Sequence, residues 1–98
     1  MNINQYIQSK RYQGSVIERI TCKDGFSMSV QASSCHYSTP CSDTATAYTE
    51  VEVGYPSANV RSFRPFAERS DRKHTGIYAY VPVEVVDAVI RRHGGIVS

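Results

Sequence analysis

An Asp-Gly pair between two strand-like runs constrains the fold of this chain more than any other feature. Asp24 and Gly25 separate residues 16–22 from residues 26–32, and hydrophobic and polar residues alternate along the second run. Glycine accepts the positive φ that a tight hairpin turn requires, and alternation is typical of a strand with one buried face. The pattern therefore predicts an antiparallel hairpin that turns at residues 23–25.

A short helix is expected before this hairpin. Ile3, Tyr6 and Ile7 recur at helical spacing, and Asn2 with Gln5 has the spacing of a capping box. A helix this short is stable only when it packs against another element.

Two further strands and a second helix are expected after the hairpin. Residues 48–55 and 77–81 alternate as strands do, and Pro82 is typical of the start of a helix. The apolar stripe of this second helix consists of Val86, Val89 and Ile90.

The 98 residues are expected to form a single α+β domain in the order α-β-β-β-β-α. The predicted architecture is a four-stranded, mainly antiparallel sheet with a short N-terminal helix and a C-terminal helix packed on one face. Residues 33–47 and 57–76 are expected to be irregular connections. The other face of the sheet is expected to stay open, with the side chains of Ser27, Ser29, Gln31, Glu50, Glu52, Tyr78 and Tyr80.

Charge and hydropathy exclude several classes of protein. Eleven Lys and Arg against nine Asp and Glu give a net charge of +2, too small to indicate direct binding of nucleic acid. No run approaches the roughly 20 apolar residues of a membrane helix, and the first residues lack the apolar run of a signal peptide. Three cysteines, an odd number, are typical of a reducing compartment, so we expect a cytoplasmic protein without membrane contact.

Three cysteines and one histidine form the nearest approach to a metal site. Cys22, Cys35, His36 and Cys41 carry the thiolate and imidazole groups that zinc prefers, but their spacing lacks the two close pairs of zinc motifs. We therefore expect no metal and no cofactor. Cys35 and His36 are adjacent and point to opposite sides of an extended segment, so they do not make a nucleophile–base pair.

Glu50 and Glu52 point the same way on one predicted strand. Such a pair can perform acid–base chemistry when its two environments differ, but it is more often a solvated strand face. No catalytic residue is assigned, and we expect binding rather than catalysis.

The basic stretch of residues 61–74 is the strongest indication of a ligand. Arginine binds phosphate or carboxylate through paired hydrogen bonds, and tyrosine rings stack on nucleic-acid bases. Glu68 and Asp71 lie among these cations and can instead pair with them. The predicted ligand-binding residues are His36, Tyr37, Arg64, Arg72, Lys73 and Tyr78.

Three segments carry a resemblance that covers most of the chain. They are DGFSMSVQAS, YTEVEVGYPS and IYAYVPVEVVDAVIRRHGG, and they resemble short accessory proteins of bacteriophages and prophages. The resemblance implies a location in the cytoplasm of the host cell and a role against host defence. It implies no residue roles.

Three functions follow as expectations. The first is a counter-defence binding protein that sequesters a small, anionic, nucleotide-derived signal, in a pocket that can lie between the subunits of a homo-oligomer. The second is an inhibitor of the anti-CRISPR type, which binds a host defence protein through exposed tyrosines and arginines. The third is a small nucleotide hydrolase, which needs Glu50, Glu52 or His36 to be catalytic.

Overall fold

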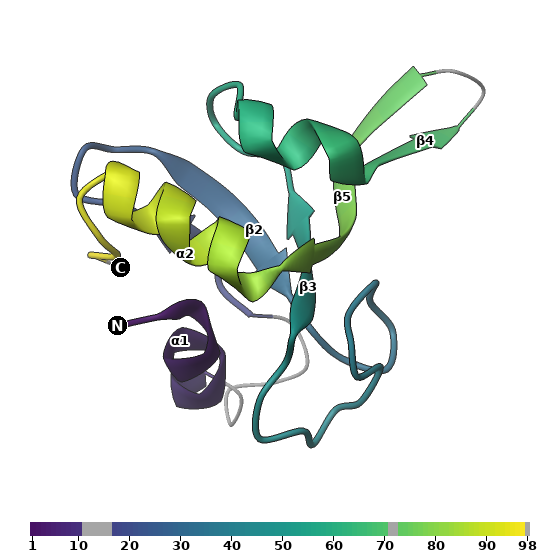
Figure 1. Ribbon diagram of the computed structural model, residues 1–98. Helices are drawn as coiled ribbons and strands as arrows, with labels where there is room; N and C mark the ends of the chain where they lie inside the picture. Colours follow the sequence, from purple (N-terminus) through teal and green to yellow (C-terminus); the bar gives the residue numbers. More distant parts are fainter. Residues whose placement is uncertain (11–16, 71–72, 98) are drawn as a thin grey trace.

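The computed structural model describes residues 1–10, 17–70 and 73–97, with only the backbone described at residues 69–70 and 73–75. Five strands form one antiparallel sheet in the order β1-β2-β3-β5-β4 (Figure 1). The elements are α1 (Ile3–Lys10), β1 (Ile20–Thr21), β2 (Ser27–Gln31), β3 (Glu50–Gly54), the 3-10 helix η2 (Arg61–Phe66), β4 (Ala67–Ser70), β5 (Lys73–Pro82) and α2 (Val83–Arg92). In the described part of the chain, no helix is long and apolar enough to span a bilayer.

The predicted α+β class, the antiparallel sheet and the two terminal helices are confirmed, but the predicted number of strands is wrong. The sheet has five strands rather than four because β5 begins at Lys73 and pairs with an additional strand, β4. The sequence pattern indicates an irregular connection there. Among the described strands β4 pairs with β5 alone and forms an edge of the sheet, where the hydrophobic alternation that reveals a strand is not required.

The Asp-Gly turn is confirmed. Gly25 has a φ of 95°, and the Cys22 N–H donates to the Phe26 carbonyl at 2.8 Å across the turn. The strand before the turn is shorter than predicted, because β1 contains two residues. Residues 11–16, which include the predicted start of that strand, lie outside the described residues.

Before β1 begins, the side chain of Gln31 forms two hydrogen bonds with the backbone of Ile17. Gln31 accepts from the Ile17 N–H at 2.9 Å and donates to the Ile17 carbonyl at 2.7 Å. Gln31 shares the face of Ser29, to whose hydroxyl it donates at 3.1 Å, but it is buried there. The prediction that this face is open at Gln31 is therefore wrong.

A β-bulge between β3 and β5 decides which side chains of β5 face the core. Val51 pairs with Val81 and Val53 pairs with Tyr78, so β5 has one more residue than β3 between these pairs. Tyr80 lies in the bulge with a φ of 54°, a left-handed conformation. Tyr78 and Val81 consequently both face the core, and Tyr78 is only 7% exposed. The prediction that Tyr78 shares the open face with Tyr80 is wrong, because the bulge breaks the alternation.

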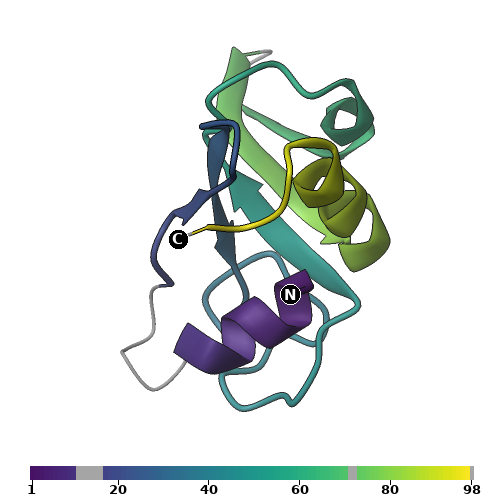
Figure 2. The ribbon, with the colours of Figure 1, turned by 90° about the vertical axis from the view of Figure 1, so that its left-hand side faces the viewer.

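The core lies between the sheet and the helices. α2 crosses one face of the sheet, and α1 lies below α2 in both views (Figures 1 and 2). Both helices bury side chains in one cluster with the strands, which confirms the predicted stripe of α2. The cluster includes Ile3, Tyr6 and Ile7 of α1, Val86, Val89 and Ile90 of α2, and Met28, Val30, Val51 and Val53 of the sheet.

The first turn of α1 is fixed by its own cap and by α2. Asn2 Oδ1 accepts from the Gln5 N–H, and the Asn2 N–H donates to Gln5 Oε1, both at 2.8 Å, which confirms the capping box. Asp87 of α2 accepts from the Ile3 N–H at 2.7 Å. Since the unpaired N–H groups at a helix start carry partial positive charge, this carboxylate stabilises α1 and joins the two helices.

The segment after α2 returns alongside β1. The Val97 N–H donates to the Thr21 carbonyl at 2.9 Å. His93 anchors the start of this segment, because its ring stacks on Phe26 with centroids 4.1 Å apart and its Nδ1–H donates to Asp24 Oδ2 at 2.7 Å.

Asp87→Ala should lower the free energy of unfolding by about 1–2 kcal/mol, because it removes a charged acceptor from the first turn of α1. Glu84→Ala, which removes an exposed acid from the same helix, should lower it by less than about 0.5 kcal/mol. Urea unfolding of both variants measures the difference. Equal losses would show that the contact between Asp87 and Ile3 does not stabilise the fold.

Stability in acid should depend on Asp24. The Phe26 N–H, and after it His93, lower the pKa of this carboxyl by donating hydrogen bonds to it. A group with a lowered folded-state pKa stabilises the fold above its unfolded value, about 3.9 for aspartate, and the contribution is lost as the pH falls through the folded value.

In urea unfolding, the wild-type chain should therefore be more stable than Asp24→Asn at about pH 6, and the difference should shrink as the pH falls below about 3.9. A stability difference that stays constant as the pH falls would contradict the assignment.

Candidate functional site

Two carboxylates of β3 hold the loop formed by residues 32–49. Glu50 and Glu52 alternate with buried residues of β3 and so point away from the core. Glu52 Oε1 accepts from the Tyr37 N–H at 3.1 Å, and Glu50 Oε1 accepts from the Thr39 hydroxyl at 2.7 Å. The carboxylate pair considered for acid–base chemistry therefore ties the loop to the sheet.

Polar side chains also hold the loop internally. Ser34 donates to the Asp43 carboxylate through its N–H at 2.9 Å and through its hydroxyl at 3.0 Å. Asn4 of α1 donates to the Tyr48 carbonyl at 2.9 Å and accepts from the Tyr48 N–H at 2.8 Å. A Ser- and Thr-rich segment without apolar periodicity is thus held in place by side chains bonded to backbone.

Tyr37 and Tyr80 meet on the face of the sheet that Glu52 occupies. The Tyr80 N–H donates to the Tyr37 carbonyl at 3.2 Å, and the two ring centroids are 5.8 Å apart. The N–H of the bulged residue thus pairs with the loop instead of with β3. Tyr37 is 44% exposed and Tyr80 is 47% exposed.

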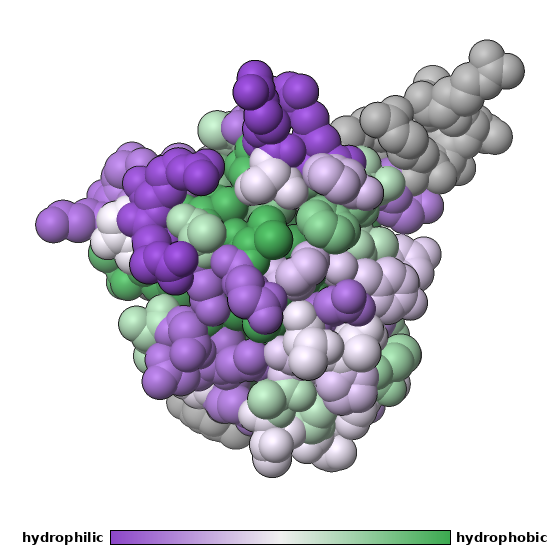
Figure 3. Space-filling view, viewed as in Figure 1, coloured by the Kyte–Doolittle hydropathy of each residue, from purple (hydrophilic) through white to green (hydrophobic). Residues whose placement is uncertain are grey.

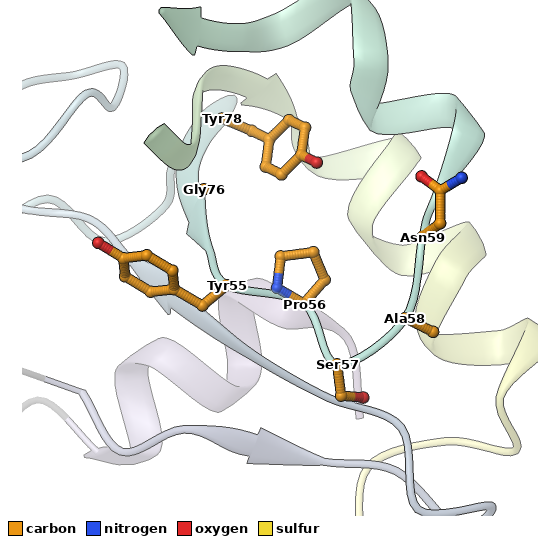
Figure 4. Close-up of a pocket in the computed structure, with 7 residues that line it drawn as sticks. All are labelled: Tyr55, Pro56, Ser57, Ala58, Asn59, Gly76 and Tyr78. Carbon is orange, nitrogen blue, oxygen red and sulfur yellow. The ribbon is translucent and has the colours of Figure 1, made fainter. Parts of the chain in front are cut away.

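Tyr55, the residue directly after β3, is a third tyrosine with an exposed ring. Its φ is 50°, and its ring lies so close to Gly76 that a Cβ atom at Gly76 would be 2.6 Å from it. Arg19 donates to the Tyr55 carbonyl and, at 3.1 Å, to the Ser27 hydroxyl, which fixes this backbone turn. The ring of Tyr55 is 60% exposed and points away from Tyr78 (Figure 4).

We call Tyr37, Tyr55 and Tyr80 the tyrosine face. Two of the three, Tyr55 and Tyr80, have left-handed backbone conformations, which are unfavourable by about 1 kcal/mol each for a residue with a side chain. Such strain is concentrated where a protein must hold a side chain in a particular direction. The tyrosine face is therefore a candidate functional surface.

A pocket of about 490 Å³ lies beside Tyr78 (Figure 4). It is lined by residues 55–59, Gly76 and Tyr78, and these residues include no charged side chain. The ring of Tyr78 is fixed by Phe63 of η2, with centroids 5.4 Å apart.

The predicted ligand residues lie in separate regions. His36 and Tyr37 belong to the loop at one end of the sheet, and Arg64 belongs to η2 at the other end (Figures 1 and 2). Tyr78 lies at the η2 end, because Phe63 packs against its ring.

The two remaining predicted ligand residues belong to the β4–β5 hairpin. Arg72 lies outside the described residues, and Lys73 is described only by its backbone, which pairs with Ser70. The structure thus brings Arg64 and Tyr78 to one end of the sheet and His36 and Tyr37 to the other, and ligand binding by the six residues stays a prediction.

His36 pairs with a residue that sequence analysis did not single out. Its Nδ1 lies 2.6 Å from the hydroxyl of Ser33, and that hydroxyl also accepts from the Cys35 N–H at 3.0 Å. Ser33 is only 4% exposed. The pair therefore closes a turn of the loop and does not present a nucleophile.

The cysteines are dispersed over the structure. Cys22 is buried, and burial raises the pKa of its thiol, whereas Cys35 and Cys41 are exposed in the loop. Among the residues that the structure describes, no group of three or more His, Cys, Asp or Glu side chains is placed to hold a metal ion.

No family model, no curated protein and no solved structure matches this chain.

Glu52→Ala should loosen the loop around Tyr37 without unfolding the sheet. Loss of the acceptor should raise the hydrogen-exchange rates of the Tyr37 and Tyr80 amides about fivefold, which corresponds to one hydrogen bond of about 1 kcal/mol. The Val53 amide should change less than about twofold, as should all three amides in the control Glu84→Ala. Equal acceleration at Tyr37 and Val53 would show that Glu52 stabilises the whole fold and not the loop.

Proposed function

We propose that this chain is a binding protein that recognises a protein partner through the tyrosine face. The observation that carries the proposal is the display of three tyrosine rings that are 44–60% exposed. Tyr37 and Tyr80 lie on the face of Glu52, and the ring of Tyr55 points away from Tyr78 (Figure 4). Tyrosine combines a large apolar contact area with a polar tip, and it is enriched among the residues that dominate binding energy at protein interfaces.

The backbone around these rings is held before any partner arrives. Tyr37 is bonded on both sides, through its N–H to Glu52 and through its carbonyl to Tyr80. The Tyr55 carbonyl accepts from Arg19. Side chains on a fixed backbone lose less conformational entropy on binding, which favours affinity.

The resemblance to phage accessory proteins supports a host defence protein as the partner, as in the anti-CRISPR type of inhibitor. Hydrolysis is less well supported, because the hydrogen bonds of Glu50 and Glu52 to the loop already give these carboxylates a structural role. Capture of a small anionic ligand would instead involve the pocket beside Tyr78, which shares Tyr55 with the tyrosine face.

Tyr80→Gly and Tyr55→Gly test this proposal, because glycine keeps the left-handed backbone while the ring is removed. The immobilised chain should retain a host protein in stoichiometric amount from a lysate of the bacterial host. With that protein purified, each variant should bind it about tenfold more weakly or worse, as expected for interface hot spots.

The matched control is Arg61→Gln, an exposed cation on η2, which should change the affinity less than about twofold. The proposal fails if no protein is retained. It also fails if both folded glycine variants bind the purified partner as tightly as the wild-type chain.

A further inference from the structure

Residues three apart in the 3-10 helix η2 form a row along one side of the helix, because this helix has three residues per turn. Val60, Phe63 and Phe66 form the row that faces the core, with Val60 and Phe63 buried and Phe66 partly buried against the same cluster. Arg61 and Arg64 form the next row, and both are exposed. The spacing of three in the segment RSFRPF therefore places Phe63 and Phe66 on the core side of η2 and the two arginines on an exposed side.

The side chains of Arg61 and Arg64 make no hydrogen bond or ion pair with the described part of the chain. Residues i and i+3 of a 3-10 helix lie directly above one another, so the two side chains leave η2 in the same direction. Hydrophilic side chains stand above η2 in the space-filling view (Figure 3). Two guanidinium groups on the same side of a short helix suit the charge of a phosphate group and can bind it through paired hydrogen bonds.

The arginine row closely follows one wall of the pocket beside Tyr78 in the sequence. That wall, residues 55–59, continues directly into η2, so that Arg61 follows Asn59 by two residues. The volume of about 490 Å³ is in the range of small-molecule sites.

Flat and polar groups border the same space in this pocket. The ring of Pro56, the ring of Tyr78 and the amide of Asn59 surround it in the close-up, while the ring of Tyr55 points away (Figure 4). A flat ligand ring can pack against Pro56 and the rim of Tyr78. The Asn59 amide can both donate to and accept from the edge of that ring.

We infer that this pocket and the arginine row bind a free nucleoside monophosphate. The base packs against Pro56 and Tyr78 with its edge on Asn59, and the phosphate binds Arg61 and Arg64. Two cations on a chain of net charge +2 suit one phosphate group better than a nucleic-acid strand. The inference does not rest on the proposed protein partner. Among the described residues that line the pocket, Tyr55 alone belongs to the tyrosine face, and its ring points away from the pocket (Figure 4).

Titration of the isotope-labelled chain with adenosine 5′-monophosphate, followed by NMR, tests the inference. Saturable shifts are expected at Asn59, Gly76 and Arg61. The double variant Arg61→Gln, Arg64→Gln should bind this probe about tenfold more weakly, with adenosine binding changed less than about twofold. Asn59→Ala should weaken both probes.

Two control variants show whether binding is specific to this pocket and its arginine row. Arg92→Gln, an exposed arginine of α2, should leave binding of the monophosphate unchanged. Tyr80→Gly should also leave it unchanged, so the two proposals can fail independently.

Four results overturn the inference. They are the absence of saturable shifts, unchanged affinity in the double arginine variant, inorganic phosphate binding as tightly as the monophosphate, and a short single-stranded oligonucleotide binding more than about tenfold tighter than the monophosphate.

Discussion

The β-bulge at Tyr80 is the constraint on which the arrangement of both candidate sites depends. A regular β5 would place Tyr78 and Tyr80 on one face and Val81 on the other. The extra residue puts Tyr78 and Val81 into the core together and turns Tyr80 outward. It also turns the Tyr80 N–H to the loop, where Tyr37 accepts it. One local irregularity thus supplies the aromatic wall of the pocket and a ring of the tyrosine face.

The loop of residues 32–49 shows how a polar segment becomes ordered without a core of its own. It buries few apolar side chains, so its placement comes from directed hydrogen bonds. Glu50 and Glu52 supply acceptors from β3, and Asn4 supplies a pair of bonds from α1. The strand, the helix and the loop are therefore coupled, and a change in any one of them reaches the tyrosine face.

The sequence predicted those features that depend on neighbouring residues. The Asp24-Gly25 turn, the capping box of Asn2 and Gln5 and the apolar stripe of α2 are local patterns, and the structure contains each of them. The features it could not predict lack a regular hydrophobic pattern. β4 exists because β5 is long enough to pair with it, and Gln31 is buried because it pairs with Ile17.

The residues of the candidate sites could likewise be predicted only in part from the sequence. Tyr37 and Arg64 could be named from the sequence because aromatic and cationic side chains in a polar context suggest binding, yet the structure places them at opposite ends of the sheet. Tyr55 was missed because its strand-like pattern continues to the residue before Pro56, although β3 ends at Gly54. The period of three in η2 was the available signal for the arginine row.

Contacts between aromatic rings, measured by NOE spectroscopy in solution, test the central role of the bulge most directly. The account predicts NOEs between the rings of Tyr37 and Tyr80 and, separately, between the rings of Tyr78 and Phe63. If β5 is instead a regular strand, Tyr78 and Tyr80 share one face. NOEs from both rings to Tyr37, or from both rings to Phe63, would contradict the account.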